Sequence, residues 1–294
     1  MIVDGVFSGG GIKGFAYVGA MQVIEEQGIQ FKRVAGTSAG AILATFIAAG
    51  FNAKELEEIF DELNLKVLLD PPKFFIGLPF LKWINLYVRF GMYRGNSLEK
   101  WFHQKLATKS ICCFGDLPKD SLKLVASDLT NGSILVLPDD LKHYGIDGST
   151  FPISRALRMS CGLPFFFEPV YLKNNQRDCV IVDGGVLSNF PLWLFDDGHQ
   201  VRPILGMKLS SSNEDMSPRE IDNAIQLFEA LFSTMKNAHD NRYIARKHEK
   251  NIIFIPVEKY SATQFDMDEE TKKKLMGIGK ERTIQFLKTW SPVW

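Results

Sequence analysis

The chain has 294 residues, and its 34 basic and 34 acidic side chains give a formal net charge of zero. Hydrophobic residues make up 46% of it and charged residues 23%, which is the balance of a folded globular protein rather than a disordered one. Nucleic-acid-binding proteins carry a strongly basic surface, so the neutral charge argues against a nucleic-acid partner. The 23 phenylalanines, against 7 tyrosines and 5 tryptophans, indicate an apolar pocket or a membrane-contacting surface.

The start of the sequence and the cysteines suggest a compartment. Met1–Gly5 shows neither the basic start nor the apolar run of a secretory signal. The cysteines lack the spacing of metal ligands, and no D-x-D-x-D-G type of calcium loop is found. We therefore expect a cytoplasmic protein with reduced cysteines and no bound metal. The cysteines are Cys112, Cys113, Cys161 and Cys179.

Predicted strands and helices alternate along the chain. Strands are expected at Ile2–Phe7, Phe31–Ala35, Leu122–Ser127, Ser133–Leu137, Cys179–Val182, Pro203–Leu209 and Asn251–Pro256. Helices are expected at Phe15–Gln27, Ala39–Ala49, Lys54–Leu63, Ile153–Ser160, Arg219–Lys247 and Asp268–Thr289. This alternation predicts one α/β domain over residues 1–294, with a mostly parallel central sheet and helices on both faces.

A glycine-rich loop, Gly9-Gly10-Gly11-Ile12-Lys13-Gly14, lies between the first strand and the first helix. Glycines allow a sharp turn that presents unpaired N–H groups at the positive end of the following helix. Such a loop binds a dinucleotide pyrophosphate or stabilises an oxyanion, and it also occurs as a simple packing turn. The loop alone leaves these three interpretations open.

A second motif, Gly36-Thr37-Ser38-Ala39-Gly40, follows the second strand and has the pattern G-x-S-x-G. At a strand-to-helix turn this pattern places the serine hydroxyl above the sheet, with small residues on either side, and the amides of the next helix favour negative charge on its oxygen. We predict that Ser38 is a nucleophile. A purely structural turn is the alternative.

A third motif, Asp183-Gly184-Gly185, follows the apolar strand Cys179–Val182. Open α/β sheets place their sites at the carboxyl ends of strands, so a carboxylate there is a candidate general base, although an isolated D-G-G is more often a turn. None of the five histidines has a local signature of a triad member. Asp183 is therefore the natural proton acceptor for Ser38. The histidines are His103, His143, His199, His239 and His248.

These three motifs, in this order, resemble those of the patatin-like phospholipase family. The segment Met159–Val170 adds to the likeness, because it has a small-residue helix end followed by proline, aromatic residues and Pro-Val. The resemblance extends from residue 9 to about residue 191 and implies a Ser38–Asp183 dyad instead of a triad. It also implies an oxyanion hole formed by the backbone of Gly9–Gly14, chiefly around Gly10 and Gly11.

The implied reaction is the hydrolysis of a phospholipid or lysophospholipid ester through an acyl-Ser38 intermediate, without a metal or organic cofactor. Gly36 and Gly40 form the nucleophile elbow, while Lys13, Gly184 and Gly185 complete the motifs. The charge of Lys13 either helps to hold the loop or a lipid phosphate, or is simply solvated.

Several features outside the motifs bear on the substrate. Phe74–Tyr93 is rich in aromatic residues and carries Lys82 and Arg89, as expected for a membrane interface or for a lid over an acyl channel, and equally for core packing. With a membrane contact, the protein is expected at the inner membrane face. Phe165–Phe167 is a candidate lining of an acyl pocket. Arg155 and Arg158 are candidates for contact with a lipid phosphate, or for a structural role.

Two other functions remain as alternatives. A lipid-binding protein without catalysis is expected to lack the nucleophile or the base, and both are present. A dinucleotide-dependent oxidoreductase needs an acidic residue at the end of the second strand, where Arg33 and Gly36 stand instead. A lipid acyl hydrolase therefore agrees best with the sequence, and its oligomeric state is left open.

Overall fold

The computed structural model of the chain describes residues 1–63, 68–70, 86–174, 177–196, 201–210, 221–222, 226–227, 230–235, 240, 249–257, 259–262 and 267–292. A central sheet runs through it in the order β10-β9-β1-β2-β4-β8-β7, with β5 paired to β4. Its strands are β1 (Ile2–Phe7), β2 (Gln30–Thr37), β4 (Leu122–Asp128), β5 (Ser133–Leu137), β7 (Val170–Lys173), β8 (Asp178–Asp183), β9 (Ile204–Lys208) and β10 (Ile252–Phe254).

The strand pairing of the sheet changes from parallel to antiparallel at β4. The pairs β10–β9, β9–β1, β1–β2 and β2–β4 are parallel, whereas β4–β5, β4–β8 and β8–β7 are antiparallel. Strand β5 takes one edge of β4 over Leu124–Asp128. On the other edge, β2 pairs with the first half of β4 and β8 with the second half. Two strand ends therefore meet beside the middle of β4, a point that we call the fork.

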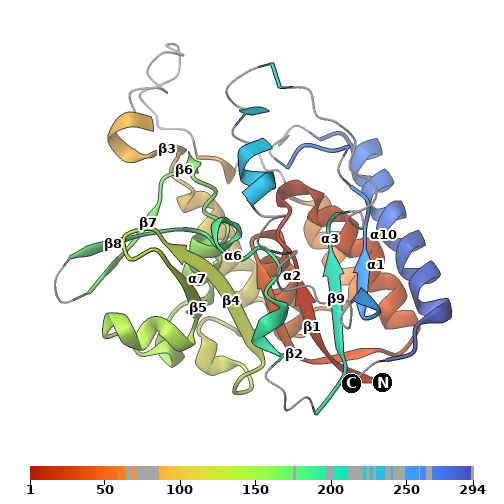
Figure 1. Cartoon of the computed structure of the whole chain (residues 1–294). Helices are drawn as coiled ribbons and strands as arrows, with labels where there is room; N and C mark the ends of the chain where they lie inside the picture. Colours follow the sequence, from red (N-terminus) through yellow and green to blue (C-terminus); the bar gives the residue numbers. More distant parts are fainter. Residues whose placement is uncertain are drawn as a thin grey trace.

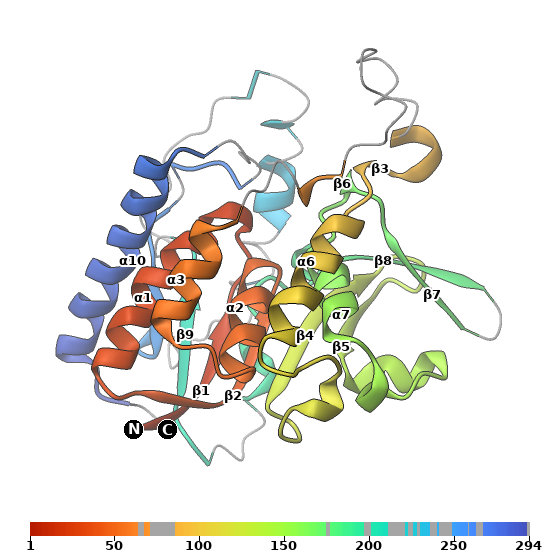
Figure 2. The ribbon, with the colours of Figure 1, turned by 180° about the vertical axis from the view of Figure 1, so that it is seen from behind.

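The helices gather on one face of the sheet (Figure 1), and the view from behind shows them lying across it (Figure 2). They pack on the larger hydrophobic core, which includes Phe7, Tyr17, Leu43, Phe102 and Leu157. The helices are α1 (Phe15–Glu26), α2 (Ala39–Ala48), α3 (Ala53–Asp61), α6 (Asn96–Ala107), α7 (Ile153–Ser160) and α10 (Glu269–Thr289).

A capping residue explains where α3 begins, and a glycine explains how closely α10 approaches α1. Asn52 caps α3, and its side chain accepts the N–H of Glu55 while the Glu55 carboxylate accepts the N–H of Asn52. Helix α10 lies against α1 at very short range, since a methyl group at Gly279 would fall 1.8 Å from the carbonyl oxygen of Ala16. The charged terminal helix can approach the sheet layer this closely because that position has no side chain.

The opposite face of the parallel strands has a different cover. A smaller core there joins Val6, Ala35, Ile204 and Ile252 to Phe190, Leu192 and Phe195. These last three residues belong to the segment 184–195, which contains the short 3-10 turns Gly184–Val186 and Leu192–Leu194. The sequence predicted helices on both faces of the sheet, whereas in the described ranges this face is covered by a loop-rich segment.

A small second sheet pairs β3 (Gly91–Tyr93) with β6 (Phe165–Phe167). It lies toward the end of the molecule where β1 and β2 terminate (Figure 1). Most of the predicted helix 219–247, and residues 74–85 of the predicted aromatic segment, lie outside the described residues. Within the described ranges, no helix combines the length and apolar character needed to cross a membrane.

Candidate active site

Ser38 occupies the turn between β2 and α2 in a conformation that side chains seldom adopt. Its backbone has φ 53° and ψ −121°, in the left-handed half of the map where a residue with a Cβ is strained. The residue is only 8% exposed. The surroundings therefore hold Ser38 in a strained and nearly buried position, which is the geometry of a nucleophile elbow.

The two glycines of this motif make the elbow possible by close approach. A methyl group at Gly36 would lie 2.2 Å from the carbonyl oxygen of Gly40, and one at Gly40 would lie 2.2 Å from the carbonyl oxygen of Phe7. Real Cβ atoms do not come that close to backbone atoms, so a larger residue at either position would push α2 away from β1 and β2. Both glycines are therefore part of the packing that sets the position of Ser38.

Asp183 lies near the Ser38 turn, at the fork. Thr37, the last residue of β2, pairs with Val125, while Asp183, the last residue of β8, pairs with Ala126. Val125 and Ala126 are consecutive in β4, so the two strands end beside each other. A methyl group at Gly184 would lie 3.0 Å from the Thr37 side chain, as this arrangement requires. The fold thus brings the predicted nucleophile and base together from distant parts of the sequence.

The carboxylate of Asp183 is held firmly. Its Oδ1 accepts a hydrogen bond of 2.7 Å from the N–H of Gly185, and its own N–H donates to the carbonyl oxygen of Gly162 at 2.9 Å. Only 2% of the residue is exposed. Gly185 therefore orients the carboxylate, while Gly184 allows the chain to turn against Val125.

The glycine loop lies directly beside the serine. A methyl group at Gly9 would be 3.1 Å from the Cβ of Ser38, and one at Gly14 would be 3.1 Å from the Cβ of Ala39. The N–H groups of Gly10 and Gly11 form no hydrogen bond within the part of the chain that the structure describes. Two unused donors thus directly follow Gly9, the loop residue that packs against Ser38.

The rest of the loop serves to hold it in place. Gly11 has φ +59°, and a methyl group there would lie 2.3 Å from the carbonyl oxygen of Ala262, which accepts the N–H of Ile12. Gly14 ends a 3-10 turn, Gly11–Gly14, and packs against the start of α2. Lys13 is half-buried, and its N–H donates to the carbonyl oxygen of Gly10 at 3.3 Å.

Sequence reasoning missed two residues that support the elbow. Ser160, fully buried at the end of α7, accepts the N–H of Ser38 at 3.0 Å and donates to the carbonyl oxygen of Val125 at 2.6 Å. The thiol of Cys161 donates to the carbonyl oxygen of Ser38 at 3.5 Å. Burial first, and then the negative charge of Asp183, raise the pKa of Cys161 well above its ordinary value, so this thiol stays protonated. Both residues belong to the segment Met159–Val170, which was singled out only by resemblance.

The described histidines stand apart from this arrangement. His103 and His143 are both exposed, and His143 lies 3.8 Å from Asp140. His199, His239 and His248 lie outside the described residues. Within the described ranges, Asp183 is thus the carboxylate that the fold brings near Ser38.

Two other candidate polar groups, Arg155 and Arg158, bind groups of the protein itself. The guanidinium of Arg158 is buried and donates to the carbonyl oxygens of Arg94 and Glu168, while Arg155 pairs with Glu99 at 3.0 Å. Burial lowers the pKa of Arg158 to about 10, although the neighbouring Glu99 opposes this shift. These arginines join α7 to α6 and to the residues that follow β3 and β6, while among the described residues the Nη1 of Arg158 has no hydrogen-bond partner.

The aromatic run Phe165–Phe167 divides among three environments. Phe165 is 54% exposed, Phe166 packs on Tyr93 with ring centroids 4.8 Å apart, and Phe167 lies under the Arg158 guanidinium at 4.9 Å. The three side chains therefore do not form one continuous apolar surface. Its role as a pocket lining stays a prediction.

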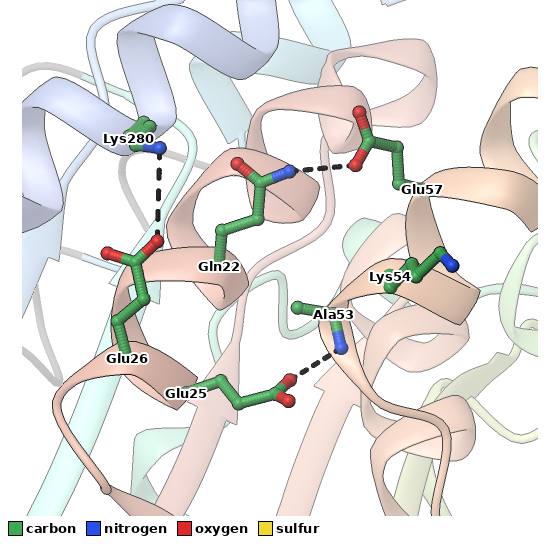
Figure 3. A pocket seen from close by; sticks show the side chains of 7 residues that line it. All are labelled: Gln22, Glu25, Glu26, Ala53, Lys54, Glu57 and Lys280. Atoms are coloured by element: carbon green, nitrogen blue, oxygen red, sulfur yellow. Dashed lines mark hydrogen bonds and ion pairs between the residues drawn. The ribbon is translucent and has the colours of Figure 1, made fainter.

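A surface groove of about 570 Å³ lies away from this site (Figure 3). Gln22 and Glu26 come from the last turns of α1, which runs back from the glycine loop, so the groove lies toward the other end of the sheet. Its polar groups largely satisfy one another: Gln22 donates to Glu57, Glu25 accepts the N–H of Ala53, and Lys280 pairs with Glu26. We assign no role in the chemistry to this groove.

An α/β sheet that carries a strained serine at the carboxyl end of a parallel strand has the layout of an acyl hydrolase. The family model described as patatin-like phospholipase matches residues 5–196, and the chain belongs to this family. It is 51% identical to the uncharacterized protein YqhO of Bacillus subtilis, over 99% of this chain and 100% of YqhO. It is 41% identical to the triacylglycerol lipase ptl3 of Schizosaccharomyces pombe, over 64% of this chain and 38% of that protein.

The fold also has counterparts among solved structures. VipD from Legionella pneumophila superimposes with a TM-score of 0.60 at 18% identity, covering 98% of this chain and 67% of VipD. At this identity the likeness concerns the fold alone. Family membership and the lipase relative together support lipid hydrolysis as the class of activity.

Proposed function

We propose that the protein hydrolyses carboxylic ester bonds of phospholipids or lysophospholipids through a Ser38–Asp183 dyad and an acyl-serine intermediate. The meeting of two strand ends at the fork carries this proposal, because it brings a strained serine and a fixed carboxylate together. The family of the chain supports the lipid substrate.

The first half-reaction transfers the acyl group to the enzyme. The Ser38 oxygen forms a bond to the ester carbonyl carbon while its proton passes to Asp183, and the carbonyl electron pair moves onto the oxygen. Unused N–H groups of Gly10 and Gly11, with the first N–H groups of α2, would stabilise that negative oxygen. When the carbon–oxygen bond to the alcohol breaks, the leaving oxygen takes the proton from Asp183.

The second half-reaction returns the serine. A water molecule attacks the acyl carbonyl and gives its proton to Asp183, and the intermediate then expels the Ser38 oxygen, which takes that proton back. The fatty acid leaves and the starting enzyme is restored. No cofactor takes part in these steps. The near-complete burial of Ser38 and Asp183 limits competing water in the acylation step.

Contact with a membrane is a further part of the proposal. Residues 74–85 of the aromatic segment lie outside the described residues, but within its remainder Tyr87 is 86% exposed, Val88 65% and Phe90 54%. Large apolar side chains beside Arg89 suit the interface between headgroups and acyl chains. The short helical turn that carries them lies near β3, at the end of the molecule that also holds the carboxyl ends of β1 and β2 (Figure 1).

Labelling with a fluorophosphonate tests the nucleophile. Wild type and Ser38→Ala are treated with the probe, with and without phosphatidylcholine vesicles, and the modified peptide is mapped. Ser121→Ala serves as the matched control, because Ser121 is also buried but precedes the first residue of β4, away from the fork. We expect labelling at Ser38 in wild type and control, and none in Ser38→Ala. Absence of labelling under both conditions would favour a lipid-binding protein without catalysis.

The base is tested by Asp183→Asn. The amide has almost the same shape as the carboxylate but cannot accept the serine proton, so kcat for a soluble 4-nitrophenyl ester should fall by about 10³-fold or more. If a histidine substitution lowered kcat equally while Asp183→Asn did not, the dyad would be wrong.

A further inference from the structure

The segment Gly184–Phe190 connects all three motifs of the site. It begins directly after Asp183, and the N–H of Ser188 folds back onto the carbonyl oxygen of Gly184 at 2.8 Å. The Thr37 hydroxyl, next to Ser38 in sequence, donates to the carbonyl oxygen of Ser188 at 2.9 Å. The N–H of Gly9 donates to the carbonyl oxygen of Asn189 at 3.0 Å. A shift of this segment would therefore reach the base, the elbow and the glycine loop together.

Asp240 anchors the far end of this segment. Its Oδ1 accepts the N–H of Phe190 at 3.1 Å, and its Oδ2 accepts the side-chain amide of Asn189 at 3.3 Å. Asp240 is 1% exposed, and its charge is compensated by Lys208, which is 4% exposed and whose Nζ lies 3.4 Å from Oδ2. A buried carboxylate without such a partner would be strongly unfavourable, so the lysine and the aspartate act as a unit.

Lys208 links the two sets of contacts that hold the start of the glycine loop. Lys208 ends β9, between Met207, whose carbonyl oxygen accepts the N–H of Ser8, and Leu209, whose N–H donates to the Ser8 hydroxyl at 3.0 Å. Ser8 immediately precedes Gly9. The first residues of the loop are thus fixed from β9 on one side and from Asn189 on the other, and the Lys208–Asp240 pair joins the two sides.

The side chain of Asn189 packs directly against the glycine loop at Gly9. Its Oδ1 is buried and has no hydrogen-bond partner among the described residues, and a methyl group at Gly9 would lie 2.6 Å from this oxygen. The amide stays in this orientation because its Nδ2 is bound to Asp240. Without this hydrogen bond the Asn189 side chain could turn away from Gly9, and the chain that carries the N–H groups of Gly10 and Gly11 would lose its support on this side.

The structure assigns to Asp240 and Lys208 the role of positioning residues for the oxyanion hole: they orient Asn189, which sets the place of the loop amides beside Ser38. This assignment rests on the proposed function, since it presupposes that the loop amides stabilise an oxyanion. Neither residue touches the reacting atoms, and both act through Asn189 and Gly9.

The first test variant is Asp240→Asn. An amide has one acceptor oxygen where the carboxylate has two, so it cannot satisfy both the Phe190 N–H and the Asn189 amide. The variant also leaves the Lys208 charge buried without a partner, which can prevent folding. A second variant, Asp240→Asn with Lys208→Met, removes that charge while keeping the loss of one acceptor.

Asp4→Asn is the matched control. Asp4 is also 1% exposed and paired with cations, Arg33 at 2.6 Å and Arg202 at 3.1 Å. It lies near the start of β1, at the other end of the sheet from the glycine loop. Its replacement breaks the ion pairs of another buried aspartate, whose arginine partners are partly exposed, without touching Asn189.

The decisive readout is a ratio of two rates. Each variant is given 4-nitrophenyl butanoate and the thionoester in which sulfur replaces the carbonyl oxygen, because sulfur is the poorer acceptor for oxyanion-hole donors. Active sites are counted by fluorophosphonate titration. A loss of folded protein lowers both rates equally and leaves the ratio unchanged, whereas misplaced loop amides lower the oxoester rate selectively.

We expect kcat for the oxoester to fall by about 10- to 100-fold in the double variant, with KM little changed, as for a catalytic group displaced by about 1 Å. The preference for oxoester over thionoester should fall by a similar factor, and Asp4→Asn should keep the wild-type preference. A wild-type preference in the double variant would overturn the assignment. Equal activity of Ser38→Ala and wild type would instead refute the proposed function itself.

Discussion

Replacement of Ser160 by alanine isolates the contact that supports the strained elbow. The Ser160 hydroxyl accepts the N–H of Ser38 and donates to the carbonyl oxygen of Val125, and the residue is fully buried. Ser160→Ala leaves two buried backbone groups without partners, each at a cost of about 1–3 kcal/mol. We therefore expect the free energy of unfolding to fall by about 2–6 kcal/mol.

The same chain offers a control with the same chemical change. Ser121 is also buried, but in the part of the chain that the structure describes its hydroxyl has no hydrogen-bond partner. Ser121→Ala removes an unsatisfied hydroxyl, so its free energy of unfolding should stay within about 1 kcal/mol of wild type or rise. The contrast between the two variants thus measures the hydrogen bonds of Ser160 rather than the loss of a hydroxyl as such.

Urea denaturation followed by tryptophan fluorescence measures the difference, provided that the dependence of the unfolding free energy on urea is the same in all three proteins. Fluorophosphonate labelling of the folded variant should also slow, because the φ of 53° at Ser38 loses part of its support. A loss in Ser160→Ala no larger than that in Ser121→Ala would refute the reasoning.

Two further predictions concern pH and membranes. Burial acts to raise the pKa of Asp128, but hydrogen bonds from Tyr144, Asn131 and Thr130 outweigh it and hold the pKa below its usual range. The stability that Asp128 supplies is thus present above about pH 4 and is lost as the pH falls through the pKa of the folded state. The difference in unfolding free energy between wild type and Asp128→Asn should therefore be smaller at pH 3 than at pH 6. A difference that does not change with pH would contradict this prediction. Tyr87→Ser with Val88→Ser should weaken binding to phosphatidylcholine vesicles about 10-fold without slowing a soluble ester, because two exposed apolar side chains are lost. Val201→Ser, at another exposed valine that lies before β9, should leave vesicle binding unchanged.

Much of the fold follows from local sequence patterns. Ile2–Phe7, Ser133–Leu137 and Ile153–Ser160 have the predicted bounds, and β2 and β8 differ from prediction only by extension at their ends. These elements combine strong hydrophobic periodicity with clear turn residues, so local interactions and burial favour the same structure. The three motifs were found for the same reason, since each lies at the end of a predicted strand.

The partners of the motifs could not be found in this way. Ser160, Asn189 and Asp240 act through hydrogen bonds to groups far away in sequence, and a buried polar residue is indistinguishable in sequence from an exposed one. Asn189 had one usable signal, its place six residues after Asp183 in a short segment before the apolar Phe190. The fork itself was also out of reach, because strand order depends on pairings that no local pattern encodes.

The fork has a consequence for the order in which the site comes into being. Ser38 and both halves of β4 are synthesised well before β8, so a nascent chain that ends before Asp178 has an elbow but no base. In such a chain the second half of β4 presents an unpaired edge where β8 will later dock, and unpaired edges attract other strands. Under the proposed mechanism, the base of the dyad and the protection of that edge therefore arrive in a single late event, the docking of six residues of β8.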